Sequence, residues 1–195
     1  MGKKTKERGA DKIKQSWIKF LFLLFLVLVV GCTTVPTTSV LTEHKIIIGG
    51  IKPVTQGRMA CLPACLEMVM RYYGCDKIDQ RKIGDELGQT LGGTKWNLVS
   101  SFLQRYDLKA EFFYDGTETK FLIRDYIRQQ IPVIAEGKKL GMEKITHVVL
   151  IVGFDNSKNL LYFIDPEKGT TSSVNYYQFH EWSTTSRCLA VVKNG

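Results

Sequence analysis

The chain has 195 residues, of which 44% are hydrophobic and 24% charged, and its formal net charge is +8. Residues 1–31 hold seven of the 27 Lys and Arg but only two of the 19 Asp and Glu, so the rest of the chain carries a net charge of only +3. That small charge excludes the concentrated basic face of a nucleic-acid-binding protein, and we expect no nucleic acid as a partner. The remaining length suits one domain with a sizeable core, which we expect to be a monomer.

Residues 1–31 have the pattern of an export signal. Basic residues come first, and an unbroken apolar run, Phe20–Val30, follows them. The run is too short to span a bilayer comfortably and suits the core of a signal peptide. Its end, Gly31-Cys32, resembles the lipobox of bacterial lipoproteins, which implies cleavage after Gly31 and a lipid on Cys32; an uncleaved N-terminal anchor is the alternative. We therefore expect a lipid-anchored membrane protein of the bacterial cell envelope, on the outer membrane if the cell is Gram-negative.

A short tether and a first strand come next. Residues 32–44 are rich in threonine, valine and serine, which favours an extended linker that holds the domain off a membrane. Lys45–Ile48 is a short run of β-branched residues closed by two glycines, and it predicts a strand. The folded domain would then occupy residues 45–195.

An amphipathic helix is predicted over residues 63–73. Pro63 fits the opening turn, where its missing N–H is not needed, and Gly74 is a suitable C-terminal stop. Apolar residues recur with helical spacing and form one face: Leu66, Val69, Met70 and Tyr73. Cys61 lies at the start of this helix, where the positive end of the helix macrodipole and unbonded N–H groups favour the reactive thiolate.

The rest of the chain is predicted to hold helices first and strands later. Helices are expected at residues 77–87, 95–106, 119–129 and 176–182. Strands are expected at residues 109–113, 131–135, 172–175 and 188–192, and a hairpin at residues 145–164. This order is typical of an α+β fold, and we expect an N-terminal helical part packed on an antiparallel β-sheet.

The hairpin carries a histidine and an acid at the end away from its turn. His147 begins the first strand, and Asp165 ends the second strand before a Pro/Gly turn, so the hairpin would bring the two side chains together. Asp155 is a competing acid, but it lies eight residues along the strand, roughly 26 Å away at the strand rise. A cysteine, a histidine and an acid together form the usual arrangement of an activated nucleophile. A histidine on an apolar strand can also be a simple core residue.

Three further cysteines, Cys65, Cys75 and Cys188, have no evident part in this chemistry. Cys65 lies one helical turn after Cys61 and is interpreted as a core residue. The spacing of the cysteines matches no zinc site, and the chemistry needs neither a metal nor an organic cofactor. Buried thiols are the default, and a disulfide such as Cys75 with Cys188 stays open in an exported protein.

These segments together resemble the bacteriocin-processing (double-glycine) peptidase family of papain-like cysteine peptidases, in a free-standing lipoprotein form. The resemblance covers residues 45–192 and rests on these pieces: Gln56 ahead of Cys61-Leu-Pro-Ala64, Arg71-Tyr-Tyr-Gly74, Gly93-Thr94, Ile131-Pro-Val-Ile134, Thr146-His147-Val-Val-Leu-Ile-Val-Gly153 and Ile164-Asp165-Pro166. It implies a papain-like fold and a peptide or protein substrate. It also implies roles: Cys61 as nucleophile, His147 as general base, Asp165 as its orienter, and Gln56, with the Cys61 backbone N–H, as oxyanion donor.

The sequence departs from that family at two places. Leu62 follows Cys61 where the family usually has glycine, and the interval from Gln56 to Cys61 is one residue shorter. The function that the sequence favours is a membrane-anchored cysteine peptidase that works through a Cys-His-Asp triad and a thioester. Two alternatives stay open: an acyltransferase or transamidase on the same triad, with an amine in place of water, and a non-catalytic lipoprotein that binds peptides.

Overall fold

A computed structural model describes residues 44–194 apart from 115, 117, 140–141 and 184–186. The expected signal peptide, the lipid-bearing Cys32 and nearly all of the expected tether therefore lie outside the described residues. Within the part that is described, no helix has both the length and the apolar character needed to cross a membrane.

A seven-stranded antiparallel sheet forms the centre of the described part of the chain. Its strand order is β2-β7-β3-β4-β5-β6, and β1 pairs with β4 beside this path. The strands are β1 Lys45–Ile47, β2 Leu108–Tyr114, β3 Val133–Lys139, β4 Met142–Asp155, β5 Leu160–Asp165, β6 Thr170–Asn175 and β7 Arg187–Lys193. Because β4 pairs with β3, β5 and β1, it joins the two halves of the sheet.

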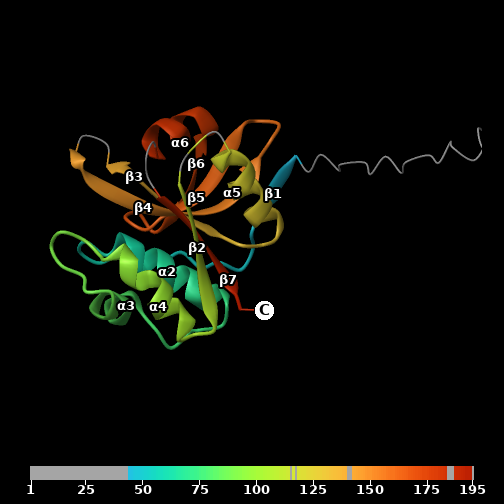
Figure 1. Cartoon of the computed structure of the whole chain (residues 1–195). Helices are drawn as coiled ribbons and strands as arrows, with labels where there is room; N and C mark the ends of the chain where they lie inside the picture. Colours follow the sequence, from blue (N-terminus) through green and yellow to red (C-terminus); the bar gives the residue numbers. More distant parts are fainter. Residues whose placement is uncertain (1–43, 115, 117, 140–141, 184–186, 195) are drawn as a thin grey trace, which may run out of the picture. The chain divides into compact units, whose positions relative to one another are not determined.

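Helices lie on both faces of this sheet. They are α2 Cys61–Tyr72, α3 Gln80–Glu86, α4 Val99–Gln104, α5 Thr119–Arg128 and α6 Tyr176–Ser183, with a 3₁₀ turn at Trp96–Leu98. Figure 1 shows α2, α3 and α4 gathered on one side of the strands, and α5 and α6 on the other.

Alternate strand residues supply two separate cores, one on each face of the sheet, as the two-residue period of a β-strand requires. On the α2 side the buried strand residues are Leu108, Ile134, Val148, Leu150, Val152, Ile164, Leu189 and Val191. On the α5 side they are Val133, Ala135, Val149, Ile151, Phe154, Leu161, Cys188 and Ala190. The predicted α+β class, with N-terminal helices packed on an antiparallel sheet, is confirmed.

Some elements differ from their predicted bounds. The second helix begins at Gln80 rather than at 77, because Asp79 Oδ1 accepts the backbone N–H of Lys82 at 2.9 Å and caps the helix there. The helix expected at 95–106 divides into the 3₁₀ turn and α4. The strand expected at 131–135 begins only after Pro132, which has no N–H to give to a ladder, and continues to Lys139.

Candidate active site

Helix α2 places Cys61 at its first position. The preceding residue, Ala60, provides no side-chain cap, so the N–H groups of the first turn are left to other acceptors. The helix is buried without interruption from Leu62 to Met70, because it packs on β4 and on α3. Cys61 is therefore a half-buried thiol at the start of a buried helix.

The sulfur of Cys61 contacts the strand that carries His147. Burial raises the pKa of the Cys61 thiol, whereas hydrogen bonds from backbone N–H groups, first that of Val148 and then those of Leu62 and Cys61 itself, lower it, and the charge of Glu136 raises it further. The net direction is upward. The N–H groups at the helix start lower the pKa of the thiol, as expected, but the loss of water on burial outweighs them.

His147 and Asp165 are in direct contact. Nε2 of His147 lies 2.8 Å from Oδ1 of Asp165, and both side chains are 12% exposed. The backbone N–H of Glu167 donates to the same Oδ1 at 3.0 Å, and Lys168 Nζ lies 4.0 Å from Oδ2. Because Nε2 faces the carboxylate, Nδ1 is the ring nitrogen that can face a thiol. The structure thus brings together the histidine and the acid that the sequence placed at the end of the hairpin.

The competing acid, Asp155, lies at the opposite end of β4. Its Oδ1 accepts the Ser157 hydroxyl at 2.6 Å and the backbone N–H of Lys158 at 3.1 Å. The Ser157 hydrogen bond is the main cause that lowers the pKa of Asp155. Asp155 therefore organises the hairpin turn.

Strands β4 and β5 change register once between the hairpin turn and the site. Close to the turn Gly153 pairs with Tyr162, whereas the next pair along the ladder is Ile151 with Phe163. Val152 is therefore an extra residue on β4. Such a β-bulge disturbs the ladder locally and shifts the pairing beyond it by one residue.

The bulge sets how far along β4 Asp165 lies. The observed register, continued by one residue, puts Asp165 opposite Val149, two residues from His147. Without the extra residue Asp165 would fall opposite Leu150, one residue further from His147. Because the bulge moves Asp165 one residue nearer to His147 along the ladder, their contact depends on the bulge.

Gln56 lies beside the same end of the hairpin. Its backbone N–H donates at 2.7 Å to the carbonyl of Pro166, the residue after Asp165. Its side-chain Oε1 is buried and has no hydrogen-bond partner among the described residues, which is uncommon for a buried amide. The loop before Cys61 therefore runs along the turn that carries the acid, despite the short interval to the cysteine.

Glu136 is a residue near the site that the sequence analysis missed. It pairs with Val148 in the β3–β4 ladder, so it shares the sheet face that contacts Cys61. It is 7% exposed, and its Oε2 accepts from Arg187 Nε at 2.9 Å. The available signal was an acid two residues after Ile134, at an inward position of an apolar strand.

Trp182 covers the ladder position opposite the histidine. In the β3–β4 ladder Gly137 is the partner of His147, and a Cβ atom on Gly137 would collide with the Trp182 ring. The indole therefore lies over the sheet next to the imidazole.

The remaining cysteines are structural. Cys65 is fully buried, its Sγ lies 3.8 Å from the Val148 carbonyl oxygen, and burial raises its pKa well above the usual range. Cys75 packs against the core under α2, whereas Cys188 lies in the core on the other face of the sheet. None of the four cysteines in the described residues is in a disulfide, so the open pairing of Cys75 with Cys188 is not formed. The same residues hold no group of three His, Cys, Asp or Glu that could bind a metal ion.

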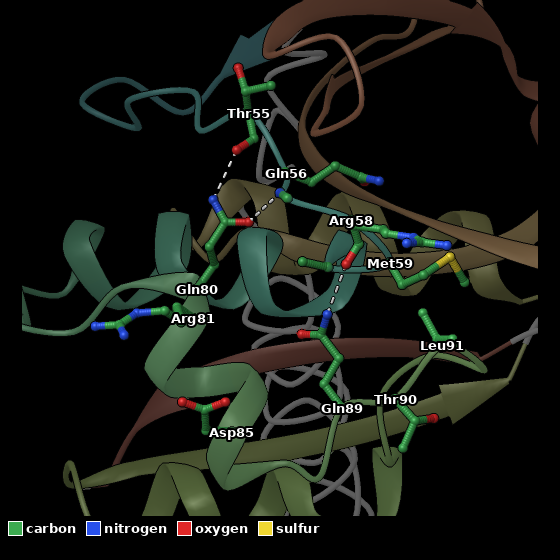
Figure 2. Close-up of a pocket in the computed structure, with 12 residues that line it drawn as sticks. Thr55, Gln56, Arg58, Met59, Gln80, Arg81, Asp85, Gln89, Thr90 and Leu91 are labelled. Atoms are coloured by element: carbon green, nitrogen blue, oxygen red, sulfur yellow. Dashed lines mark hydrogen bonds between the residues drawn. The ribbon is translucent and has the colours of Figure 1, made fainter.

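A pocket of about 650 Å³ opens beside the loop that precedes Cys61. Loop residues 55–60 line it together with Gln80, Arg81 and Asp85 of α3 and with residues 89–91. Figure 2 shows the side chains of Gln80 and Gln89 reaching from this second wall to the backbone of the loop. The pocket therefore separates α3 from the loop that carries Gln56, and two amide side chains connect them.

Residues 48–188 match a family model described as the peptidase C39-like family. No curated protein matches the chain. The match includes Gln56, Cys61, His147 and Asp165, and it covers most of the described residues.

Three solved structures share the fold. The peptidase domain of Streptococcus ComA, a bifunctional ABC transporter of a quorum-sensing pathway, has a TM-score of 0.59 and 19% identity over 72% of this chain and 98% of that chain. A protein from Bacillus anthracis described as a C39-like peptidase has a TM-score of 0.60 and 15% identity over 78% and 100%. A double-glycine motif protease from an AMS/PCAT transporter, solved with its leader peptide, has a TM-score of 0.54 and 20% identity over 76% and 99%. These likenesses confirm the expected papain-like peptidase fold.

Proposed function

Because this chain belongs to the peptidase C39-like family, we propose that it is a cysteine peptidase that cleaves peptide bonds with Cys61 as its nucleophile. The contact of 2.8 Å between His147 Nε2 and Asp165 Oδ1 is the observation that carries the proposal. It favours a catalytic imidazole over a core histidine, because a ring held by a carboxylate, on the strand that the Cys61 sulfur contacts, has the partner that general-base catalysis needs.

The contact with Asp165 decides which ring nitrogen acts as the base. An ionised carboxylate only accepts hydrogen bonds, so Nε2 of His147 carries its proton and Nδ1 presents a lone pair. Nδ1 would take the proton of the Cys61 thiol, and Asp165 would stabilise the imidazolium that forms. This ion pair would offset the burial that raises the pKa of the thiol.

The thiolate would attack the carbonyl carbon of the scissile peptide bond, and the electrons of the C=O bond would pass to an oxyanion. The Cys61 backbone N–H and the Gln56 carboxamide would donate hydrogen bonds to that oxyanion. When the C–N bond breaks, the imidazolium gives its proton to the leaving amine and a thioester remains on Cys61. Water, deprotonated by His147, would then hydrolyse the thioester.

As substrate we propose a peptide with two glycines ahead of the cleaved bond. One structural neighbour is described as a double-glycine motif protease in complex with a leader peptide. The half-buried position of Cys61 is compatible with such a substrate. Residues without side chains let a peptide backbone approach a recessed sulfur closely.

Two probes test the reaction on the full-length chain in detergent. A peptide that ends in Gly-Gly linked to aminomethylcoumarin reports peptide cleavage, and p-nitrophenyl acetate reports acylation of the thiol. We expect Cys61→Ala to lose at least about 1000-fold in both assays, because the nucleophile is gone. Cys75→Ala, which removes another partly buried thiol, is the matched control and should stay within about twofold.

The two probes separate the parts of the proposal. Retained activity of Cys61→Ala on both would reject Cys61 as the nucleophile. Acylation without peptide cleavage would reject the Gly-Gly substrate while keeping the triad. An added primary amine that appears as an amide product in mass spectra would favour an acyltransferase over a peptidase.

We also propose that residues 1–31 are a lipoprotein signal, that Cys32 bears the lipid, and that residues 32–44 connect it to a domain of residues 45–195. The basic start, the apolar run and Gly31-Cys32 support this proposal. The expected result is incorporation of labelled palmitate into the wild-type chain and recovery in the membrane fraction of the cell envelope. Cys32→Ala should lose the label, and equal labelling of both chains would reject the anchor.

A further inference from the structure

The side chain of Gln80 clamps the loop that carries Gln56. The backbone N–H of Gly57 donates to Gln80 Oε1 at 2.7 Å, and Gln80 Nε2 donates to the carbonyl of Thr55 at 2.8 Å. Gln56 lies between these two backbone groups, so one carboxamide holds the chain on both of its sides (Figure 2). The orientation of the amide is determined, because the reversed amide would set donor against donor and acceptor against acceptor.

Gln56 is also held from the opposite direction. Its own N–H donates to the Pro166 carbonyl at 2.7 Å. At the same turn Thr55 packs against Gly169, whose φ is +65°, and the Thr55 hydroxyl fills the space that a Cβ atom on this glycine would need. Residues 55–57 are therefore fixed between α3 and the turn that follows the acid.

Gln80 is itself tied to the helix of the nucleophile. Its backbone N–H donates at 2.7 Å to Oε2 of Glu67, a residue of α2 that is 3% exposed. The other oxygen of Glu67 lies 2.5 Å from Arg71 Nη2. Because Gln80 is the first residue of α3, its N–H has no acceptor inside its own helix. The contacts therefore run from α2 through Glu67 and Gln80 to the backbone on both sides of Gln56.

Gln89 supports the same loop one step further along. Its Nε2 donates to the carbonyl of Arg58 at 2.9 Å, and its side chain lies so close over Gly84 that a Cβ atom there would collide with it. Glycine inside a helix costs about 1 kcal/mol relative to alanine, so α3 gives up stability where Gln89 crosses it. After Arg58 the loop turns sharply through Met59, whose φ of 57° is uncommon for a residue with a side chain.

We propose that Gln80 is a positioning residue for the oxyanion site, which holds the Gln56 carboxamide in place without touching substrate. The inference rests on the proposed role of Gln56 as an oxyanion donor. Such a donor contributes fully only if it already stands where the negative charge will develop. A loop that turns within the short interval between Gln56 and Cys61 needs this outside support, because its own backbone strain would otherwise be relieved by movement.

A comparison of two reactions of the same thiol tests the proposal on the full-length chain. Acylation of Cys61 by p-nitrophenyl acetate passes through an oxyanion, whereas alkylation by iodoacetamide does not. Gln80→Met keeps the length of the side chain and removes both hydrogen bonds, so we expect the acylation rate to fall about tenfold and the alkylation rate to change less than about twofold. Lys82→Met, on an exposed neighbouring position of α3, is the matched control for both rates.

A double-mutant cycle connects the effect to Gln56. If Gln80 acts through Gln56, then Gln80→Met should slow acylation no further in a Gln56→Ala background. An equal fall of acylation and alkylation, or a fall in acylation that persists in that background, would overturn the proposal. Gln80→Glu, which keeps the shape but sets an oxygen against the Thr55 carbonyl, should show the same split between the two rates if the methionine variant does not fold.

The same measurements separate this proposal from the proposed function. Unchanged acylation in Gln56→Ala would reject the oxyanion role of Gln56, and the role of Gln80 with it. Unchanged acylation in Cys61→Ala would instead reject the nucleophile. Slower acylation in Gln56→Ala with wild-type rates in Gln80→Met would reject the positioning role alone.

Discussion

Gly153 lies so close to Ile46 that a Cβ atom on this glycine would stand 2.5 Å from the Ile46 carbonyl oxygen. Strand β1 therefore packs on β4 at the residue next to Val152, where the pairing of β4 with β5 changes register. The close approach at Gly153 and the bulge at Val152 therefore involve neighbouring residues of β4. Because the bulge sets the register of Asp165 on β4, the contact between β1 and β4 affects the proposed catalytic pair.

We expect Gly153→Ala to lower the free energy of unfolding by about 1–3 kcal/mol, because the obstacle is backbone that cannot rotate away as a side chain can. Urea unfolding measures the loss. Gly49→Ala, where a Cβ atom would meet nothing within 4 Å, is the matched control and should change stability by less than about 0.5 kcal/mol. Equal stability of the two variants would show that β1 can retreat without loss.

Asp165→Asn is expected to lower kcat by about 100-fold or more, with little change in KM. The amide no longer holds the histidine in the form that bears a proton on Nε2, and it no longer stabilises the imidazolium. The hydrolysis of the Gly-Gly coumarin peptide measures this. Asp155→Asn, which alters the acid at the far end of β4, should leave kcat per folded molecule within about twofold. A larger loss in Asp155→Asn than in Asp165→Asn would contradict the pairing.

The rate at which Cys61 reacts with iodoacetamide should rise with pH, because burial raises the pKa of the thiol. The raised pKa means that Cys61 without a base stays protonated until the pH exceeds the ordinary thiol value of 9.0. In His147→Ala, alkylation should therefore be slow at neutral pH and rise about tenfold per pH unit up to alkaline values. At neutral pH the wild type should react about 10- to 100-fold faster, because each unit of pKa is a factor of ten.

His180→Ala is the control for that experiment, because it removes an exposed histidine of α6. Its alkylation profile should follow the wild type. If His147→Ala also follows the wild type, then the imidazole does not take up the proton of this thiol.

Arg187 is expected to protect the nucleophile from a buried negative charge. It binds Glu136 at 2.9 Å and lies over the Trp96 ring at 5.0 Å. Arg187→Met leaves the Glu136 carboxylate unpaired, so we expect the free energy of unfolding to fall by about 1–3 kcal/mol. The fall is smaller than for a fully buried pair because the arginine is 41% exposed. Alkylation of Cys61 at neutral pH should also become slower, since the charge of Glu136 raises the pKa of the thiol.

Adding Glu136→Gln to Arg187→Met separates charge from packing. The double variant should recover most of the alkylation rate, because the negative charge is gone while the shape remains. If the double variant stays as slow as Arg187→Met, the arginine acts by packing against Trp96.

Local signals in the sequence were sufficient for most of the fold. The apolar spacing around Leu66 predicts α2, and the observed helix differs by only two residues at its start. The short connection at residues 156–158 predicts the hairpin, and its strands run on to the positions of His147 and Asp165. These features depend on residues that are close in sequence, and single-sequence patterns capture such features well.

The features that escaped prediction all depend on contacts between distant segments. The bulge at Val152 exists beside β1, about a hundred residues earlier in the chain. Glu136 reaches the site through the register of β3 on β4, which no local pattern specifies. The upward direction of the Cys61 pKa follows from burial, whereas the sequence shows only the helix start.

We expect the two partners of the proposed reaction, Cys61 and His147, to lie on parts of the protein that open at different rates. Around His147 and Val149, strand β4 is paired with β3, so we expect this stretch of backbone to exchange with deuterium only after that ladder opens. Cys61 lies in the first turn of α2, which lacks a side-chain cap, and helices begin to unfold at such ends. Gentle warming would therefore move the sulfur away from the imidazole while the sheet is still intact, and turnover would cease below the melting temperature.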